Sequence, residues 1–317
     1  MTSTQIINNI TDFIPHRYEN ILLDTITKNP ETSFKGNLEL NIKENDSLQR
    51  YLFYKINNTN KKVIITPFYM EIMALAAIVI YNNQDKEKIA IFASISNFEY
   101  FDSATLGETI SGEVAHISSK KGFIKCGGTL TSGKKELCKG ILSAFFVDIN
   151  PESQELKPSD IDFPQNHPIL YNKKSRNKEE AMIICDTLIE YTNTSYIATY
   201  TYKDTHPLTK GHFPNNPIMM GVMQWLSLED SLCHYLETTD QSGNNKYTCN
   251  TTIYNQNKIK IADIKNTTIE SWINQPNTLN QTNILKTGKI NFRNMLKPND
   301  SLYIVVTDIA KLWLFLD

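Results

Sequence analysis

An internal repeat constrains the fold of this chain more than any other feature of its sequence. ILLDTI at 21–26 resembles IICDTL at 183–188, which lies 162 residues later. Two further kinds of segment recur in the same order, first an apolar helix candidate and then a strand–turn–strand candidate. The helix candidates cover 67–81 and 222–236, and the strand–turn–strand candidates cover 97–110 and 291–304. Because both halves share this order, we expect the chain to be a duplication of one unit.

The repeat divides the chain into two units of similar length. We expect a first unit at 1–150, a polar linker with several Pro and Lys residues at 151–175, and a second unit at 176–317. The offset between the halves grows from 155 residues at the helix to 194 at the Asn-Phe pair that follows it. This growth indicates an insertion of 39 residues within about 237–285. Because the insertion is rich in Asn and Thr, we predict that it lies largely outside the core.

The second unit is also short of chain after its Asn-Phe pair. In the first unit 51 residues follow Asn97 up to Asp148, whereas 26 residues follow Asn291. The end of the second unit therefore lacks the equivalent of about two strands. Two outcomes remain open. The insertion supplies replacement strands, since Lys258–Ile264 alternates as a strand does, or the sheet is left short.

The segment GHFPNNPIMMGV at 211–222 is the strongest candidate for a functional site. Pro214 and Pro217 fix φ and remove backbone donors, which predicts a rigid loop. The apolar run Val222–Leu236 follows and predicts a buried helix. The loop would deliver His212 to the N-terminus of this helix, where the helix dipole favours negative charge. A base beside an anion-stabilising helix end suits chemistry on a carbonyl compound.

This segment resembles the signature of the 3-hydroxyacyl-[acyl carrier protein] dehydratase family of the hot-dog fold. The matching residues are His212, Phe213, Pro214, Pro217, Gly221 and Val222. Met220 replaces the proline of the family pattern, and Leu226 stands where the family has its acidic residue. A second match lies at the N-terminus, where IPHRYENILLDTI at 14–26 resembles the opening of the family. Within that opening, His16 is interpreted as a structural residue.

The resemblance implies an α+β double hot-dog fold, in which two long central helices are wrapped by a curved antiparallel sheet. Hot-dog dehydratases resemble one another in building each active site from the histidine of one unit and the acid of the other. Superposing the two helices of the repeat places Glu71 opposite Leu226. The same superposition places Asn57 opposite His212, and no histidine lies within 17–115. We therefore predict one complete site, made by His212 and Glu71, and one position that has lost both groups.

Loss of water from a 3-hydroxyacyl thioester needs a base at the α-carbon and an acid for the leaving hydroxyl. The imidazole of His212 suits the first task, and a desolvated Glu71 carboxyl suits the second. The N–H of Gly221 at the helix start is the expected oxyanion donor. The resemblance implies that the Ile218 carbonyl orients the imidazole. Further substrate-binding residues are predicted at Phe213, Pro217 and Val222. Alternative acids on the second helix are Glu229 and Asp230.

Two other functions remain open. The departures from the family pattern favour a non-catalytic hot-dog partner subunit or an acyl-thioester binding protein. These departures are Thr66, Leu75, Met220 and Leu226. A hot-dog thioesterase would use the same pocket with an acid and water, although the His-Phe-Pro motif argues against it. The resemblance implies no dissociable cofactor, because the substrate is carried on the phosphopantetheine of acyl carrier protein. Acyl carrier protein is the expected partner, with homo- or hetero-oligomers of other biosynthetic enzymes. Fatty-acid, polyene and polyketide-like pathways all remain open.

Charge and composition exclude several other classes of function. A net charge of −2 gives no electrostatic basis for binding nucleic acid. Five dispersed cysteines without a C-x-x-C motif predict reduced thiols. The first residues lack the basic and apolar regions of a signal peptide, so we expect a cytoplasmic protein. No run of about 18 apolar residues predicts a membrane span. The histidines lack metal-ligand spacing, so we assign no metal.

Overall fold

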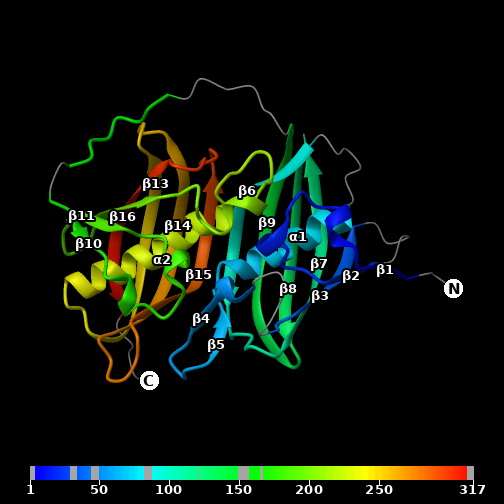
Figure 1. Ribbon diagram of the computed structural model, residues 1–317, viewed down its shortest axis with the longest axis horizontal. Helices are drawn as coiled ribbons and strands as arrows, with labels where there is room; N and C mark the ends of the chain where they lie inside the picture. The colour runs from blue at the N-terminus through cyan, green and yellow to red at the C-terminus, as the bar shows by residue number, and fades with distance from the viewer. Residues whose placement is uncertain are drawn as a thin grey trace.

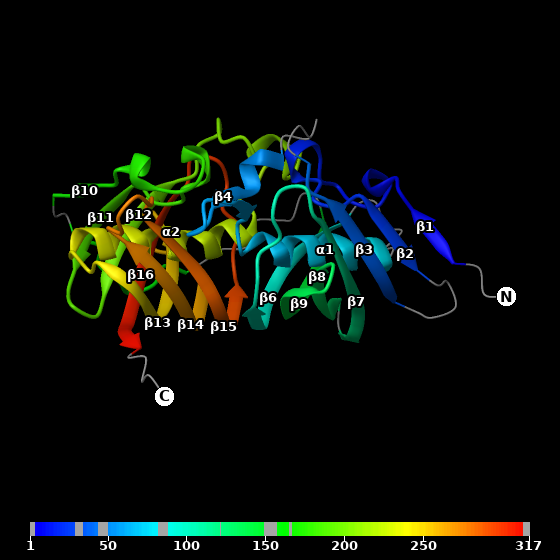
Figure 2. The same ribbon diagram turned by 90° about the horizontal axis from the view of Figure 1, so that it is seen from below.

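Two α-helices and one large sheet form the described part of this protein. The computed structural model describes residues 4–28, 34–43, 50–81, 88–120, 122–148, 157–164 and 167–312. The helices α1 (Phe68–Tyr81) and α2 (Gly221–Thr238) occupy the predicted positions. Both lie on the same face of the sheet, in a row across it (Figures 1 and 2). Because α1 is apolar on nearly all sides, it is buried along almost its whole length.

The sheet has fourteen strands among the described residues. Those of the first half are β1 (Gln5–Ile7), β2 (Thr25–Lys28), β3 (Lys35–Asn41), β6 (Lys88–Tyr100), β7 (Thr109–Lys120), β8 (Phe123–Ser132) and β9 (Lys135–Asp148). Those of the second half are β10 (Ile169–Leu170), β11 (Thr187–Tyr191), β12 (Tyr196–Thr201), β13 (Gly243–Asn255), β14 (Lys260–Ile273), β15 (Gln281–Phe292) and β16 (Ser301–Leu312). A separate hairpin consists of β4 (Tyr54–Ile56) and β5 (Lys62–Ile64). The short 3-10 helices in the described ranges are η1 (Ile10–Asp12), η2 (Tyr18–Asn20), η3 (Arg50–Phe53), η4 (Lys173–Ser175), η5 (Glu180–Met182) and η6 (Thr209–Gly211).

The strand order is β1-β2-β3-β7-β8-β9-β6-β15-β14-β13-β16-β12-β11-β10, and every neighbouring pair is antiparallel. The two halves meet at the centre, where β6 pairs with β15 and Ile95 lies opposite Ile290. The expected antiparallel sheet is therefore present and is continuous across both halves.

The two halves of the sheet match in position but differ in chain order. Counted outward from the centre, β6, β9, β8, β7 and β3 correspond to β15, β14, β13, β16 and β12. After α1 the chain forms β6 and β7 and then the hairpin β8–β9. After α2 it forms the corresponding hairpin β13–β14 first, and only then β15 and β16. The 39-residue insertion and the two missing C-terminal strands are therefore the same two strands, placed earlier in the chain.

The prediction that the insertion within 237–285 lies outside the core is wrong. Strands β13 and β14 are interior strands of the sheet, and alternate residues of β13 are buried. Tyr247, Cys249 and Ile253 point into the core, each 4% exposed or less. The average composition concealed this alternation, because the Asn and Thr residues mostly occupy the other face of a strand. Thr is itself favourable in strands. The insertion therefore supplies the replacement strands that the sequence left open.

Matching backbone contacts relate the two halves. Arg17 donates its N–H to the carbonyl of Gly211 at 3.1 Å, and Ile56 donates its N–H to the carbonyl of Asn177 at 2.7 Å. Ile56 and Gly211 are 155 residues apart, as are Glu71 and Leu226. In each contact, the segment that begins one unit bonds to the segment that precedes the helix of the other. One apolar core extends through both halves.

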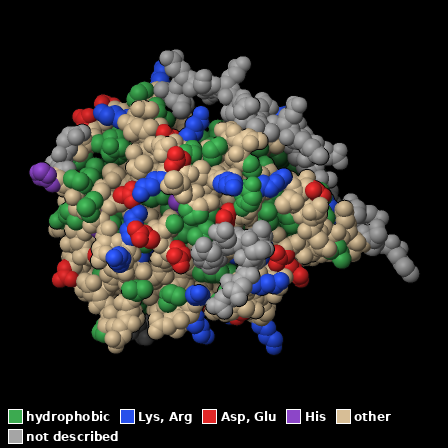
Figure 3. Space-filling model, in the orientation of Figure 1, with side chains coloured by type: hydrophobic (Ala, Val, Ile, Leu, Met, Phe, Trp, Pro, Cys, Tyr) green, Lys and Arg blue, Asp and Glu red, His purple; other side chains and the backbone are tan. Residues whose placement is uncertain are grey.

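The surface carries both signs of charge. On the face drawn in Figure 3, acidic and basic side chains are interspersed with hydrophobic ones. Within the described residues, neither helix is both long enough and apolar enough to span a membrane.

Candidate active site

A cavity of about 550 Å³ lies where the two halves meet. Its walls are largely apolar and include Ala77 of α1, Phe92 of β6 and Leu142 of β9. Three titratable side chains, those of His16, Glu71 and His212, form part of its lining. The size and the combination of apolar walls with a few polar groups are typical of small-ligand sites.

His212 lies in the loop between η6 and α2 and is held by two hydrogen bonds to one residue. Its Nδ1 lies 3.0 Å from the carbonyl oxygen of Ile218, and the N–H of Ile218 donates to the carbonyl of His212 at 2.8 Å. Because a carbonyl can only accept, Nδ1 carries the hydrogen and Nε2 keeps its lone pair. Burial, assisted by the neighbouring His16, lowers the pKa of His212 to about 4. The imidazole is therefore neutral at physiological pH.

Glu71 lies in the first turn of α1 and is 3% exposed. Burial raises the pKa of its carboxyl to about 7, and the nearby His212 opposes this rise. Its Oε1 lies 3.6 Å from Nε2 of His16, whereas Oε2 is buried without a hydrogen-bond partner in the described part of the chain. A carboxyl in this environment holds its proton up to about neutral pH.

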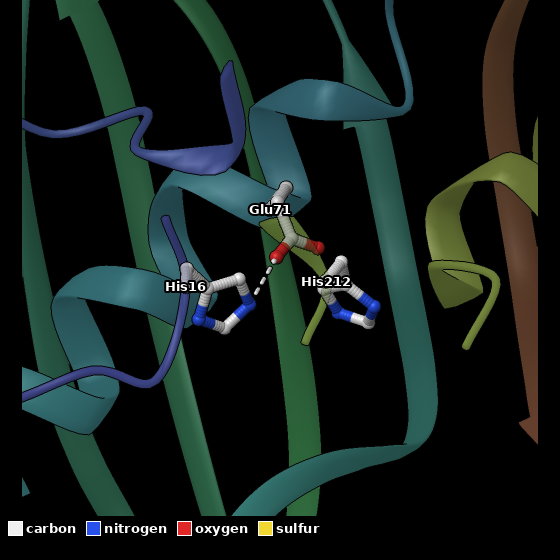
Figure 4. A group of neighbouring side chains, drawn as sticks. All are labelled: His16, Glu71 and His212. Carbon is white, nitrogen blue, oxygen red and sulfur yellow. Dashed lines mark ion pairs between the residues drawn. The ribbon is translucent and has the colours of Figure 1, made fainter. Parts of the chain in front are cut away.

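His16 is a site residue that the sequence reasoning did not assign. It lies between η1 and η2 and is 2% exposed, and its imidazole faces both Glu71 and His212 (Figure 4). The ring centroids of His16 and His212 are 5.0 Å apart, and that of His16 lies 4.9 Å from the ring of Phe213. The interpretation of His16 as a structural residue did not include this place in the cavity lining. His16 lies in 14–26 and His212 lies in 211–222, and these are the two segments that resemble the dehydratase family. The shared resemblance of the two segments is the signal that could have identified His16.

The other predicted binding residues divide into two groups. Gly221 and Phe213 line the cavity, whereas Pro217 and Val222 do not. Gly221 is the first residue of α2, so its N–H belongs to the turn whose amides have no partner within the helix. A Cβ at this position would lie 3.2 Å from the ring of Phe292, which also lines the cavity.

Gln224 also lines the cavity, although it was not among the residues predicted from the sequence. It lies one turn into α2, is 3% exposed, and its Oε1 is buried without a partner among the described residues. An amide on a helix face that is otherwise apolar is the signal that could have marked it.

The alternative acids Glu229 and Asp230 lie elsewhere, in a buried ionic cluster with Lys55, Arg176 and Lys178. Neither residue lines the cavity, and Leu226 beside them is fully buried. Asp230 lies 2.8 Å from Arg176 and 2.6 Å from Lys178, and Glu229 lies 3.4 Å from Lys55. Both acids are thus committed to salt bridges.

One further property of the site concerns metals. In the part of the chain that the structure describes, His16, Glu71 and His212 offer donor atoms that all lie within 4.8 Å of one another. Two imidazoles and a carboxylate form a donor set that zinc accepts. The absence of a metal therefore stays a prediction, which metal addition and removal can test.

Comparisons with known proteins find likeness in structure rather than in sequence. No family model and no curated protein sequence matches the chain. Among solved structures, the dehydratase domain from the CurK module of curacin polyketide synthase is 12% identical, with a TM-score of 0.47 over 92% of this chain and 97% of that domain. The dehydratase heterocomplex ApeI:P from Xenorhabdus doucetiae is 15% identical, with a TM-score of 0.36 over 44% of this chain and 91% of that one. A fluoroacetyl-CoA-specific thioesterase, FlK, is 14% identical, with a TM-score of 0.26 over 27% of this chain and 64% of that one.

Proposed function

We propose that this protein is a dehydratase of 3-hydroxyacyl thioesters carried on acyl carrier protein. The main support for the proposal is that two groups with complementary roles, the side chains of His212 and Glu71, lie close together at one cavity. A neutral imidazole with a free Nε2, that of His212, comes from the second half, and a protonated carboxyl, that of Glu71, comes from the first. Elimination of water needs this pair of groups, one to accept a proton and one to give a proton.

In the proposed reaction, Nε2 of His212 removes the proton from the α-carbon of the thioester. The electrons of the broken C–H bond form the new double bond between the α- and β-carbons. The bond from the β-carbon to its hydroxyl breaks, and the carboxyl of Glu71 gives its proton to the departing oxygen, which leaves as water. The bond of Nδ1 to the Ile218 carbonyl supports this role, because it fixes the tautomer and stabilises the imidazolium that forms.

The thioester oxygen gains negative charge as the α-proton leaves. The N–H of Gly221, at the positive end of the α2 dipole, is suited to stabilise that charge. The apolar walls beside α1 would receive the acyl chain, and we infer that a curved sheet wraps each helix and encloses that chain. The phosphopantetheine arm of the carrier protein would reach the site from outside, so no dissociable cofactor is proposed.

The test is mass spectrometry of 3-hydroxyacyl carrier proteins of several chain lengths after incubation with the protein. The parent should produce the enoyl product. This product is about 18 mass units lighter than the substrate, because the reaction removes one water. We expect His212→Ala to slow turnover by about 10²–10⁴-fold, the usual worth of a positioned general base. His116→Ala, on β7 and outside the cavity lining, is the matched control and should retain parental turnover.

Each remaining outcome selects a different function. Dehydration by His212→Ala at the parental rate would exclude the proposed base. Binding of the acyl carrier protein without turnover would favour the non-catalytic partner subunit or acyl-thioester binding protein. Release of the free 3-hydroxy acid would favour a thioesterase.

A further inference from the structure

We infer that His16 is a third functional member of this site, a positioning residue that holds the Glu71 carboxyl and stabilises its ionised form. The inference rests on the proposed dehydratase function, because it concerns how the acid of that reaction works. It gives a function to the N-terminal segment, which contributes neither the base nor the acid.

The backbone around His16 is fixed on both sides. The guanidinium of Arg17 donates from Nη1 to the carbonyl of His16 and to that of Ile14, each at 2.7 Å. This segment is also bonded to the loop that carries His212. The N–H of Arg17 donates to the carbonyl of Gly211 at 3.1 Å, and Asn20 donates from Nδ2 to the carbonyl of Leu208 at 3.1 Å. The segment that carries His16 and the loop that carries His212 therefore form one rigid assembly.

Gly211 shows how closely these two segments approach. A Cβ at this position would lie 2.1 Å from the carbonyl oxygen of Arg17 and 2.3 Å from Nδ2 of Asn20. Any larger residue would push the segments apart. The approach that brings His16 to the cavity therefore depends on a glycine directly before His212.

Among the titratable groups of the described residues, His16 is the one that can donate to the Glu71 carboxyl. The titratable groups that approach the carboxyl are His16, from the N-terminal segment, and His212, whose Nδ1 hydrogen is committed to Ile218. Arg17 directs its guanidinium to backbone carbonyls. Two other charged side chains line the cavity, Arg293 and Lys297. Arg293 is paired with Asp263 at 2.6 Å.

His16 has a hydrogen to give to this carboxyl. Its Nδ1 is buried without a partner among the described residues, and its Nε2 is the atom that faces Oε1 of Glu71. A neutral imidazole carries one hydrogen, and on Nε2 that hydrogen points at the carboxyl. The separation of 3.6 Å is longer than a hydrogen bond, and a small rotation of the ring closes it once Glu71 has lost its proton.

This arrangement divides the two oxygens of Glu71 between two tasks. Oε1 faces His16, and Oε2 is left to meet the hydroxyl of the substrate. When Glu71 gives up its proton, the hydrogen of His16 stabilises the carboxylate, so proton donation becomes more favourable. The phenyl ring of Phe213 packs edge-on against His16 and limits its movement.

A series of substitutions at one position separates this function from simple packing. His16→Phe keeps a flat ring against Phe213 but removes the donor. His16→Gln places an amide N–H near the position of Nε2, whereas the shorter His16→Asn places one near Nδ1. We expect kcat of His16→Phe and His16→Asn to fall roughly 10–100-fold, the worth of a hydrogen bond to a charged group, and that of His16→Gln to stay near the parental value.

Ionisation of Glu71, followed by NMR of 13C-labelled glutamate side chains with Glu71→Gln to assign the signal, gives a measurement that needs no turnover. The pKa of Glu71 should rise in His16→Phe and return toward the parental value in His16→Gln. An unchanged Glu71 pKa in His16→Phe would overturn the inference, and so would equal kcat losses in the Gln and Phe variants. If instead the parent dehydrates no substrate while the Glu71 pKa still responds to His16, the proposed function fails and the contact with His16 stands.

Discussion

Replacing Glu71 by Gln should stabilise the fold at alkaline pH while removing the acid of the proposed reaction. The pKa of Glu71 is raised from 4.5 to about 7, because burial disfavours its charged form. A carboxyl with a raised folded-state pKa adds stability below its unfolded-state pKa, and that stability is lost as pH rises through the folded-state value. Between pH 4.5 and about pH 7 the folded protein binds more protons at Glu71 than the unfolded chain does, so stability falls as pH increases.

The size of the effect follows from the two pKa values. A shift of one pKa unit corresponds to about 1.4 kcal/mol, so ionising Glu71 should cost about 3 kcal/mol at pH 8 and about 1 kcal/mol at pH 5. The glutamine variant does not titrate and escapes this cost. Relative to the parent, it should gain about 2 kcal/mol of unfolding free energy on going from pH 5 to pH 8. Glu71→Gln should not dehydrate 3-hydroxyacyl substrates at either pH 5 or pH 8.

Urea unfolding of the parent and of Glu71→Gln at pH 5 and pH 8 measures the effect. Histidines of the unfolded chain also titrate in this range, but they do so in both proteins. In the folded protein the pKa values of His16 and His212 are lowered to about 3 and about 4, so both imidazoles stay neutral across the range. Glu136→Gln, an exposed position at the start of β9, removes the same charge and should show no such dependence. The reasoning fails if the parent and Glu71→Gln differ by the same amount at both pH values.

Three further predictions concern the same structure. Turnover should be highest between about pH 4 and pH 7, because the base His212 must be neutral above its lowered pKa of about 4 and the acid Glu71 must be protonated below its raised pKa of about 7. A pH profile of kcat/KM, which reports the ionisations of the free enzyme, measures both limits, and full activity at pH 9 would contradict them. Dialysis against EDTA should leave turnover unchanged, whereas added Zn²⁺ should inhibit in competition with substrate, because three donors lie within 4.8 Å of one another. In urea unfolding, Glu229→Gln should destabilise the protein by about 3–5 kcal/mol, because it leaves an excess of buried cations in the ionic cluster around Glu229. Lys55→Met should destabilise it by less, because it leaves equal numbers of positive and negative charges in that cluster.

Local periodicity made the helices and several strands predictable. Residues 195–202 alternate in the way that is typical of a strand, with tyrosines on one face, and in β12 Tyr196 and Tyr200 are buried. The position of the β13–β14 hairpin could not be predicted in this way. Alternating residues indicate that a segment is a strand, but they do not indicate which strand it pairs with, and this pairing joins residues far apart in sequence.

The site shows the same division between local and tertiary information. The order of the repeat paired His212 with Glu71, and the fold brings these two side chains to one cavity. His16 could not be paired in this way, because its place beside Glu71 follows from the close approach at Gly211 and not from a match between the two helices. Pro217 and Val222 match the family motif but lie outside the cavity lining.

The two related positions of this chain show why one of them can be lost. Each position has a backbone hydrogen bond between the start of one half and the segment before the helix of the other. Arg17, at the start of the first half, donates to Gly211, whereas Ile56, before α1, donates to Asn177 at the start of the second half. At the first, a carboxyl and two imidazoles are buried without counter-charges. Burial disfavours the charged form of each group, so the site lowers the stability of the folded protein at any pH at which one of them would be charged in the unfolded chain. At the second, buried salt bridges such as Lys55–Glu229 join residues of both halves and resist their separation. A symmetric dimer must repeat every substitution at both of its sites. A fused chain is free of that constraint, so one position can keep acid–base chemistry while the other binds the halves together.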